Sequence, residues 1–467
     1  MRLMQWVVAL AMAGAAMAFA LAGAAKAQEA PGEWHGVLSA GGIELRIGIT
    51  ITAGPDGALA GTLTSPDQGA AVIPMGAVTL EGGKLTLVIP RIRGRYEGTW
   101  DSAQQAWVGV FTQAAPLPLT LVKGPPVALR RPQTPQKPYP YREVEVAFES
   151  APDVTLAGTL TLPEGKGPFS AVAMITGSGP QDRDEYLLGH RPFLVIADEL
   201  TRHGIAVLRY DDRGVAKSKG SFLTATSADF AVDAEAAAAF LRTRPEIDPR
   251  KVGLIGHSEG GMIAPLVAAA DPKIAFVVLM AGPGVPTREL MRAQREAITK
   301  VMGGTPAVIA ANAAAWDRVE DALLTAKDWP RARARMKEIL LEAYTKAGVP
   351  AEPAAKATDA ALLQVGTPWY KYFIGFDPGP TLSKLRVPVL AINGDKDLQV
   401  VSSQNLPAIR AALKGHKDVT IVELPGLNHL FQTSATGDPR EYGKIEETIA
   451  PAALHLMSSW IVAHTKH

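Results

Sequence analysis

The pattern of hydrophobic and polar positions changes near residue 140. Over residues 33–122, short runs that alternate polar and apolar residues are separated by Gly-rich turns, among them Pro55-Asp56-Gly57 and Gly82-Gly83. A period of two is typical of half-buried strands, and these turns favour hairpins. We predict a small antiparallel β domain, either an open barrel or a sandwich, with strands over residues 42–52, 58–64, 77–80, 84–89, 96–100, 106–111 and 117–121.

Three tryptophans of this region, Trp34, Trp100 and Trp107, recur beside glycines. An aromatic platform for a ligand and a buried packing cluster are both compatible with this pattern. Packing is favoured because large aromatic side chains are usually buried. Residues 123–141 are rich in proline and predict a semi-rigid linker between two domains.

Strand-length apolar runs alternate with helical periodicity over residues 142–467. We predict strands over residues 142–149, 155–162, 171–176, 205–210, 276–280, 389–392 and 420–424, and a further strand that ends in the Gly-x-Ser-x-Gly motif of residues 256–260. We predict helices over residues 193–203, 227–242, 262–270, 406–413 and 445–464. Strands that alternate with helices imply a mostly parallel sheet covered by helices on both faces, which is an α/β fold.

A helical stretch over residues 283–380 interrupts this series between two strands. One apolar face carries Met336, Ile339 and Leu340, and another carries Leu290 and Met291. An insertion at this place lies over the carboxyl edge of a parallel sheet, so we predict a cap that shapes a substrate pocket. Its last part, residues 369–376, is strongly aromatic, and we assign Trp369 and Phe373 to the pocket, with packing inside the cap as the alternative.

The sequence Gly256-His257-Ser258-Glu259-Gly260 follows an apolar strand and runs directly into an Ala-rich helix. Gly-x-Ser-x-Gly in this context predicts a nucleophile elbow, a tight turn that holds the serine in a strained conformation with its hydroxyl exposed. Gly256 and Gly260 allow the neighbouring backbone to approach closely. Ser258 is therefore the candidate nucleophile.

A serine hydroxyl needs a base and a carboxylate that orients the base. Of the nine histidines, His429 follows a late strand directly, whereas His257 is expected to be packed and to point away from the serine. Asp395 and Asp397 both follow the strand over residues 389–392, and the spacing Gly-x-x-Asp-x-x-Val favours Asp397 as the acid. The backbone N–H groups of Glu259 and Ser178 are the candidates for an oxyanion hole.

Composition excludes several classes of function. The chain of 467 residues has 47 Lys and Arg, 46 Asp and Glu, and a net charge of +1, which gives no electrostatic basis for binding nucleic acid or a membrane surface. Cysteine is absent, so thiolate chemistry, disulfides and Cys-based metal sites are excluded. We expect no cofactor and no metal.

The first residues have the features of an export signal. Arg2 precedes an apolar run over residues 6–25, and Ala25-Lys26-Ala27 forms an A-x-A cleavage pattern. We predict a signal peptide, residues 1–27, and an exported protein that is periplasmic or secreted, without a stable membrane partner after cleavage. An uncleaved anchor helix is the alternative, because about twenty apolar residues can just span a bilayer.

Several motifs together resemble one family. They are Gly256-His257-Ser258-Glu259-Gly260-Gly261, Arg209-Tyr210-Asp211-Asp212-Arg213-Gly214, Thr176-Gly177-Ser178-Gly179-Pro180-Gln181-Asp182-Arg183-Asp184, the Asp397 loop and Asn428-His429. Over about residues 140–467 the chain resembles the secreted bacterial carboxylesterases within the serine aminopeptidase-like family of α/β hydrolases. The resemblance implies an α/β-hydrolase fold with a helical cap, here with the added N-terminal β domain. Ala216 stands where that family usually has a glycine, in Arg213-Gly214-Val215-Ala216-Lys217-Ser218.

These observations favour an exported serine hydrolase that cleaves small-molecule carboxylic esters, with Ser258, Asp397 and His429 as its triad. One alternative is an aminopeptidase or acyl-amide hydrolase of the same family, in which Glu259 holds the ammonium group of the substrate. Another is a protein that binds cell wall or polysaccharide through its β domain and carries an idle hydrolase fold. The presence of every triad residue type at a suitable place argues against the idle fold.

Overall fold

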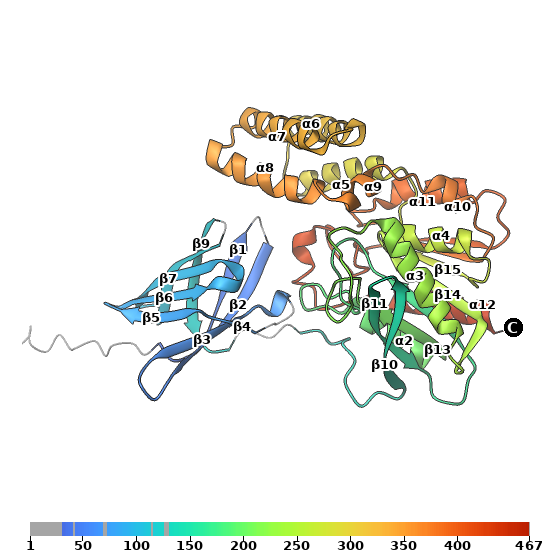
Figure 1. Ribbon diagram of the computed structural model, residues 1–467, viewed down its shortest axis with the longest axis horizontal. Coiled ribbons are helices and arrows are strands. Elements are labelled where there is room, and N and C mark those ends of the chain that lie inside the picture. The colour runs from blue at the N-terminus through green and yellow to red at the C-terminus, as the bar shows by residue number, and fades with distance from the viewer. Residues whose placement is uncertain (1–29, 41–42, 69–71, 114, 126–129, 467) are drawn as a thin grey trace, which may run out of the picture. The chain divides into compact units, whose positions relative to one another are not determined.

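The computed structural model describes residues 30–40, 43–68, 72–113, 115–125 and 130–466. The predicted signal peptide, residues 1–27, lies outside this part of the chain. The chain divides into two compact units, Met1–Leu129 and Arg130–His467. Each unit is described by itself below, and Figure 1 labels the helices and strands of both.

The first unit is one antiparallel sheet. Its strands are β1 (Gly32–Ala40), β2 (Ile43–Ala53), β3 (Leu59–Thr64), β4 (Ile73–Pro74), β5 (Ala77–Glu81), β6 (Lys84–Ile89), β7 (Gly94–Asp101), β8 (Ala106–Thr112) and β9 (Pro116–Lys123), with the short 3-10 helices η1 (Pro66–Gln68) and η2 (Pro90–Ile92). The strands pair in the order β4-β3-β2-β1-β9-β8-β7-β6-β5. Strands β1 and β4 were not predicted from the sequence.

The two ends of this sheet meet. The N–H of Met75 donates to the Gly61 carbonyl of β3 at 2.9 Å, and the next N–H, of Gly76, donates to the Val88 carbonyl of β6 at 2.8 Å. The segment between β4 and β5 therefore joins the strands at both ends of the sheet. The result is a single curled, barrel-like sheet and not a two-sheet sandwich.

Aromatic residues fill the interior of this barrel. Trp34 and Trp107 are fully buried, and Trp100 is partly buried. The three rings meet edge to face at centroid distances of 5.3 to 6.2 Å, an arrangement that aromatic pairs prefer. The indole N–H of Trp34 donates to the Ala30 carbonyl at 2.8 Å. The packing alternative therefore describes these tryptophans better than a ligand platform.

Part of the predicted linker belongs to the second unit, which begins at Arg130. Arg131 donates to the carbonyls of Leu188 and Ile445 at 2.7 and 3.0 Å. Gln133 accepts hydrogen bonds from the N–H groups of Thr448 and Ile449. These bonds hold the Pro-rich segment against the rest of this unit from residue 131 onward.

The second unit is built on an eight-stranded sheet. Its strands are β10 (Arg142–Ala151), β11 (Val154–Leu162), β12 (Phe169–Ile175), β13 (Ile205–Tyr210), β14 (Ile247–His257), β15 (Val277–Met280), β16 (Val389–Gly394) and β17 (Val419–Leu424), in the order β10-β11-β13-β12-β14-β15-β16-β17. The pairs β10–β11 and β11–β13 are antiparallel, and all later pairs are parallel. The predicted mostly parallel sheet is confirmed.

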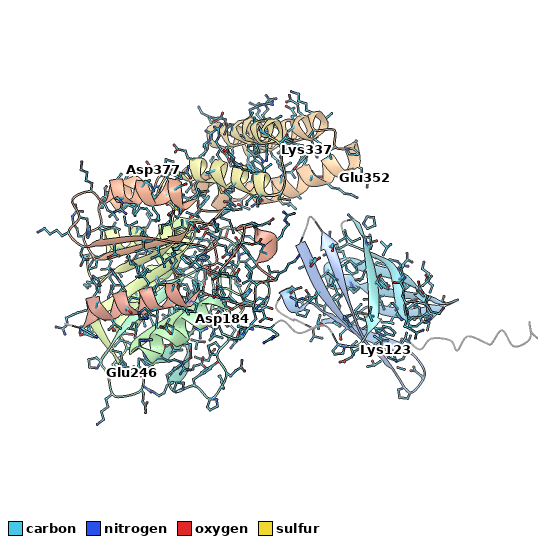
Figure 2. All side chains as sticks on the ribbon, turned by 180° about the vertical axis from the view of Figure 1, so that it is seen from behind. Lys123, Asp184, Glu246, Lys337, Glu352 and Asp377 are labelled. Carbon is cyan, nitrogen blue, oxygen red and sulfur yellow. The ribbon has the colours of Figure 1, made fainter. Side chains whose placement is uncertain are left out.

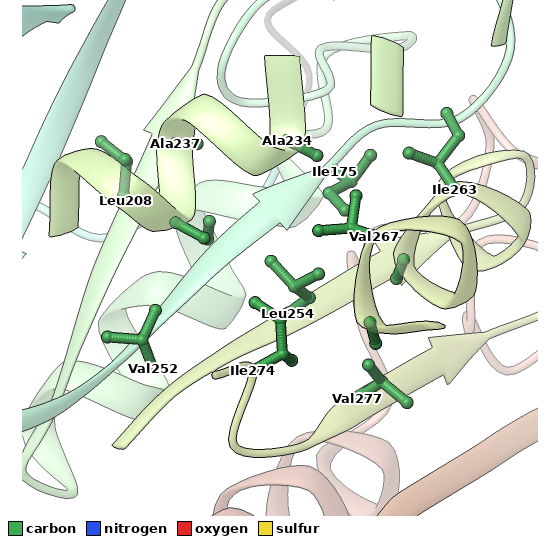
Figure 3. Packing of buried hydrophobic residues seen from close by; sticks show 14 of the residues in the cluster. Ile175, Leu208, Ala234, Ala237, Val252, Leu254, Ile263, Val267, Ile274 and Val277 are labelled. Carbon is green, nitrogen blue, oxygen red and sulfur yellow. The ribbon is translucent and has the colours of Figure 1, made fainter. Parts of the chain in front are cut away.

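Helices cover both faces of this sheet. The helices α3 (Ser227–Arg242), α4 (Gly260–Ala270), α10 (Gly379–Leu382) and α11 (Ser402–Ala412) share one apolar cluster with the strands. Figure 3 shows part of that cluster, where Ala234 and Ala237 of α3 and Val267 of α4 pack over Leu254 of β14. The helices α2 (Pro192–Arg202) and α12 (Pro451–Thr465) pack against the opposite face. Because both faces of the central strands are buried, their sequences are continuous apolar runs.

Between β15 and β16 the chain forms a helical insertion. It contains α5 (Thr287–Val301), α6 (Pro306–Thr325), α7 (Trp329–Lys346), α8 (Ala351–Val365) and α9 (Pro368–Ile374), followed by α10. Met336, Ile339 and Leu340 lie in its own apolar core. Charged side chains such as Lys337 and Glu352 project from its outer surface (Figure 2). The insertion is thus a small packed helical layer attached to the sheet.

The last helix differs from its prediction. The sequence predicted a helix over residues 445–464, but α12 begins at Pro451. The residue before a proline is disfavoured in helical conformation, and proline is well suited to the first turn. Within the described residues, no helix of the second or the first unit combines the length and apolarity needed to cross a membrane.

Candidate active site

Ser258 occupies the turn between β14 and α4. Its φ is 55°, in the left-handed region that costs a non-glycine residue roughly 1–3 kcal/mol. Its N–H donates to the Met280 carbonyl of β15 at 2.8 Å, which holds the turn against the sheet. A Cβ on Gly256 would lie 2.0 Å from the Gly260 carbonyl oxygen, and one on Gly260 would lie 2.2 Å from the Ile175 carbonyl oxygen. Both positions of this elbow therefore require glycine.

Asp397 follows β16 and is 2% exposed. Its Oδ2 accepts a hydrogen bond from Nδ1 of His429 at 2.8 Å. Its Oδ1 accepts the N–H groups of Gln399 and Val400 at 2.7 and 2.9 Å, which fix the plane of the carboxylate. Asp395 is exposed and instead accepts the N–H of Gly426 at 2.6 Å. Of the two aspartates, Asp397 is the one brought to His429.

His429 lies in the loop after β17 and is 4% exposed. The preceding Asn428 is fully buried, and its Oδ1 accepts the N–H groups of Leu430 and Gln432, each at 3.0 Å. These bonds form the turn that presents the imidazole. Because Nδ1 donates to a carboxylate, Nε2 carries the free lone pair in the neutral ring. His429 therefore has the tautomer that a general base requires.

Ser258 and His429 line one cavity of about 270 Å³. The loop after β12 contributes Gly177 and Ser178 to its wall, and the helical insertion contributes Leu290, Met291, Gln294, Gln364, Trp369 and Phe373. The rings of Trp369 and Phe373 stack at 5.2 Å. Ser178, Glu259, Trp369 and Phe373, which the sequence assigned to the site, thus share this cavity with Ser258 and His429, and Asp397 lies behind His429.

The carboxylate of Glu259 is buried beneath the elbow, at 2% exposure. Its Oε1 accepts hydrogen bonds from the Ser227 hydroxyl at 2.6 Å and from the Trp369 indole N–H at 2.8 Å. Burial raises the pKa of Glu259, and hydrogen bonds from Ser227, Trp369 and Ser178 oppose that rise. Glu259 therefore ties the helical insertion to the elbow, and its carboxylate is already occupied rather than open to a substrate ammonium group.

Ser178 and Glu259, the two residues proposed for the oxyanion hole, both line the cavity of Ser258. Glu259 immediately precedes α4, so its N–H lies at the positive end of that helix. Ser178 lies in the loop after β12, whose Gly177 approaches the nucleophile so closely that an added Cβ would be 3.2 Å from the Ser258 Cβ. Within the described residues, neither the N–H of Ser178 nor that of Glu259 donates to another backbone carbonyl. Both are available to a developing oxyanion.

Sequence reasoning did not single out Glu185, which accepts hydrogen bonds from the Gly177 N–H and from His257. It follows the acidic motif that ends at Asp184 and has no spacing signal of its own. His257 is buried, as expected, but it also contacts the carbonyl of His429. Ala216, the departure from the family pattern, has φ 45° and thus adopts the left-handed conformation without glycine. No cluster of three or more His, Asp or Glu side chains suited to a metal ion occurs in the residues described.

The strand order, the elbow and the His–Asp pair define the class of protein. The chain belongs to the alpha/beta hydrolase family, whose model matches residues 174–442. The α/β-hydrolase fold that the sequence predicted is therefore confirmed.

Two named relatives match parts of the chain. Esterase EstD from Thermotoga maritima is 29% identical over 293 residues, which are 62% of this chain and 61% of that protein. Thiohydrolase apmlB from Arthrinium phaeospermum is 31% identical over 143 residues, 30% of this chain and 44% of that protein. The chain thus spans less than two thirds of the length of either relative.

Among solved structures, the alpha/beta hydrolase GrgF from Penicillium sp. sh18 is 17% identical and covers 70% of this chain and 100% of its own, with a TM-score of 0.43. The Pyrococcus furiosus esterase Pf2001 is 15% identical and covers 72% of this chain and 97% of its own, with a TM-score of 0.42.

Proposed function

We propose that this protein is a serine carboxylesterase that cleaves small carboxylic esters through an acyl-serine intermediate. The observation that carries the proposal is a strained serine that shares a cavity with a histidine, whose Nδ1 is held by a buried carboxylate at 2.8 Å. The 29% identity to an esterase supports ester hydrolysis as the reaction.

In the first half of the reaction, Ser258 Oγ attacks the ester carbonyl carbon while Nε2 of His429 accepts the hydroxyl proton. The imidazolium that forms is stabilised by Asp397. The carbonyl oxygen becomes an oxyanion that accepts hydrogen bonds from the N–H groups of Ser178 and Glu259. Collapse of this intermediate breaks the C–O bond to the alcohol, which leaves with the proton from His429.

The second half repeats this chemistry with water. Nε2 of His429 takes a proton from the water, the hydroxide adds to the acyl carbon, and the acyl–Ser258 bond breaks. Ser258 recovers its proton and the carboxylic acid leaves.

The lining of the cavity motivates the proposal of a short acyl group. Apolar side chains of the insertion, Leu290, Trp369 and Phe373, bound its volume of about 270 Å³ beside Ser258. Trp369 and Phe373, from the insertion that acts as the proposed cap, close one side. We further propose that residues 1–27 direct export. N-terminal sequencing of the mature protein should then begin at Gln28.

The substitution Ser258→Ala tests the nucleophile. We expect kcat on p-nitrophenyl acetate to fall by about 10³-fold or more, because the covalent route is removed while the fold remains. A serine-directed phosphonate should label wild type at Ser258 only. Ser178→Ala is the control, because it keeps its backbone N–H and should still be labelled at Ser258. Labelling at Ser178, or full activity in Ser258→Ala, would contradict the assignment.

A further inference from the structure

A second buried histidine–carboxylate pair lies beside the first. His257, at the end of β14, is 5% exposed and directly precedes Ser258. Its Nδ1 lies 2.9 Å from Oε1 of Glu185, and its Nε2 lies 3.0 Å from the carbonyl oxygen of His429. The rings of His257 and His429 are 4.9 Å apart between centroids.

The partners of His257 determine how many protons this pair holds. A backbone carbonyl only accepts hydrogen bonds, so Nε2 must carry a hydrogen. The contact between Nδ1 and the Glu185 carboxyl needs a further proton, shared between an imidazole and a carboxylate. A neutral imidazole and an ionised carboxylate together supply one hydrogen for two bonds. The pair therefore holds one proton more, shared between Nδ1 of His257 and Oε1 of Glu185.

Two catalytic loops are joined through this pair. Oε1 of Glu185 also accepts the N–H of Gly177 at 2.8 Å, next to the proposed oxyanion donor Ser178. At the other end, His257 donates to the backbone of His429. The loop after β12 and the loop after β17 are thus connected through two buried side chains, which line the same cavity as Ser258.

We propose that Glu185 and His257 are positioning residues that hold the loop after β12, which carries Ser178, and the loop after β17, which carries His429, in place around Ser258. Their shared proton is retained throughout the reaction. This inference rests on the proposed function of Ser258 and His429. Neither side chain touches the reacting atoms in this role.

A second buried histidine shows why the carboxylate matters. His190 is fully buried, and its ring nitrogens contact the Thr448 hydroxyl, the Tyr442 carbonyl and the Gln432 amide, with no carboxylate among their hydrogen-bond partners in the described residues. Burial, with a smaller contribution from Arg131, lowers the pKa of His190 to about 4. His190 is therefore neutral at the pH at which the pair is expected to be charged.

For His257, burial also acts to lower the pKa, but the Glu185 carboxylate, the His429 carbonyl and more distant Asp397 raise it, and the net direction is upward. The ionisable groups that face His257 are Glu185, His429 and Asp397. Because its pKa is raised, the charged pair persists as pH rises past the ordinary value for histidine and is lost only as pH passes the raised pKa.

The proton count can be measured without any activity. In the full chain labelled with ¹⁵N-histidine, at pH 8, we expect both ring nitrogens of His257 to be protonated in wild type and in Ser258→Ala. His190 should show one protonated and one unprotonated nitrogen. His257→Gln and His190→Gln assign the two signals. A neutral His257, with the same pattern as His190, would overturn the proposal even if Ser258 proves to be the nucleophile.

A double-mutant cycle tests the positioning role. Glu185→Gln keeps an oxygen that can accept hydrogen bonds but removes the charge, so at least one bond in the connection from Gly177 to His429 is lost. We expect kcat on p-nitrophenyl acetate to fall by about 100-fold, the scale of a 1 Å misplacement, with KM changed less than about threefold. His257→Gln should have a similar effect, and the double variant should lose no more than either single variant.

The matched control is His464→Gln, which removes a histidine that also pairs with a carboxylate, Asp418 at 3.2 Å, but does not line the cavity of Ser258. It should lower the melting temperature and leave kcat within about twofold. Additive losses of kcat in the double-mutant cycle would overturn the positioning role. A fall in kcat that only follows the melting temperature in Glu185→Gln, His257→Gln and the control would overturn it too. If ester hydrolysis itself survives in Ser258→Ala, the proposed function fails, and the proton count of His257 still stands as a separate result.

Discussion

The interior of the first unit and the carboxyl edge of the second unit are both buried, but they contain different chemistry. The barrel interior holds an almost purely apolar cluster around Trp34, Tyr96 and Trp107. The edge of the second sheet instead buries Asp397, His429, Glu259, His257 and Glu185. Burying an ionisable group costs free energy unless it is paired.

That cost is offset in the second unit by specific hydrogen bonds, such as those between Asp397 and His429 and between Glu185 and His257. Replacing a buried ion pair by apolar side chains of similar volume is often neutral or stabilising, so stability alone does not account for such pairs. Their concentration at one sheet edge therefore indicates chemistry, whereas the barrel interior has the composition of a packing core.

The largest loss of activity that would test this comparison is expected at Asp397, the acid of the proposed triad. Asp397→Asn should lower kcat by about 10⁴-fold, because an asparagine amide leaves His429 in the wrong tautomer. Asp395→Asn should change kcat less than about tenfold, since Asp395 is exposed and its variant can still accept the N–H of Gly426. Steady-state rates on p-nitrophenyl acetate measure both. The opposite ranking would move the acid two residues upstream.

Much of this site could be predicted because its geometry is encoded locally. The elbow around Ser258 requires glycines at fixed positions, and the strand before it is a plain apolar run. His429 follows a strand directly, which separates it from histidines on helices. Even the choice of Asp397 over Asp395 followed from loop spacing, and the contacts agree with it.

What the sequence did not reveal depends on contacts between distant segments. Glu185 acquires its role only because the fold brings it to His257, 72 positions away. The bond from Trp369 to Glu259 crosses 110 positions. Strand β4 has two residues, too few for any period, and in β1 (Gly32–Ala40) the alternation is broken because Gly36 is buried and Val37 is exposed. Helix α12 starts later than predicted, because Pro451 takes the first helical position and disfavours helical conformation in the residue before it.

A substitution in the barrel tests the opposite expectation, a loss of stability without a loss of activity. Trp107→Ala removes a fully buried ring and should destabilise the first unit by about 3–5 kcal/mol. All proposed site residues lie in the second unit, so kcat on p-nitrophenyl acetate should stay within about twofold at temperatures below the transition. Calorimetry of the full chain with parallel rate measurements checks both statements. A loss of kcat as large as that of a site variant would mean that the barrel takes part in catalysis.

The smallest effect on activity is expected at Phe373, where the helical insertion lines the cavity. This substitution is also the most informative about the substrate. Phe373→Ala enlarges the cavity while leaving the bond between Trp369 and Glu259 in place. We expect kcat/KM for octanoyl esters to rise by about tenfold relative to acetyl esters, because one to two methylenes in an apolar pocket are worth roughly 1–3 kcal/mol. Trp369→Phe keeps a ring but loses the indole N–H, so it should loosen the insertion and change chain-length preference less.

Tyr372→Ala is the matched control for this series. Tyr372 lies on the same helix α9, stacks on Phe376 at 6.0 Å, and does not line the cavity that holds Ser258. Its removal should lower thermal stability and leave the ratio of octanoyl to acetyl rates unchanged. Equal falls for all chain lengths in Phe373→Ala and Tyr372→Ala would make Phe373 a packing residue of the insertion. A shift toward longer chains in Phe373→Ala alone would make the helical insertion the element that restricts this hydrolase to short acyl groups.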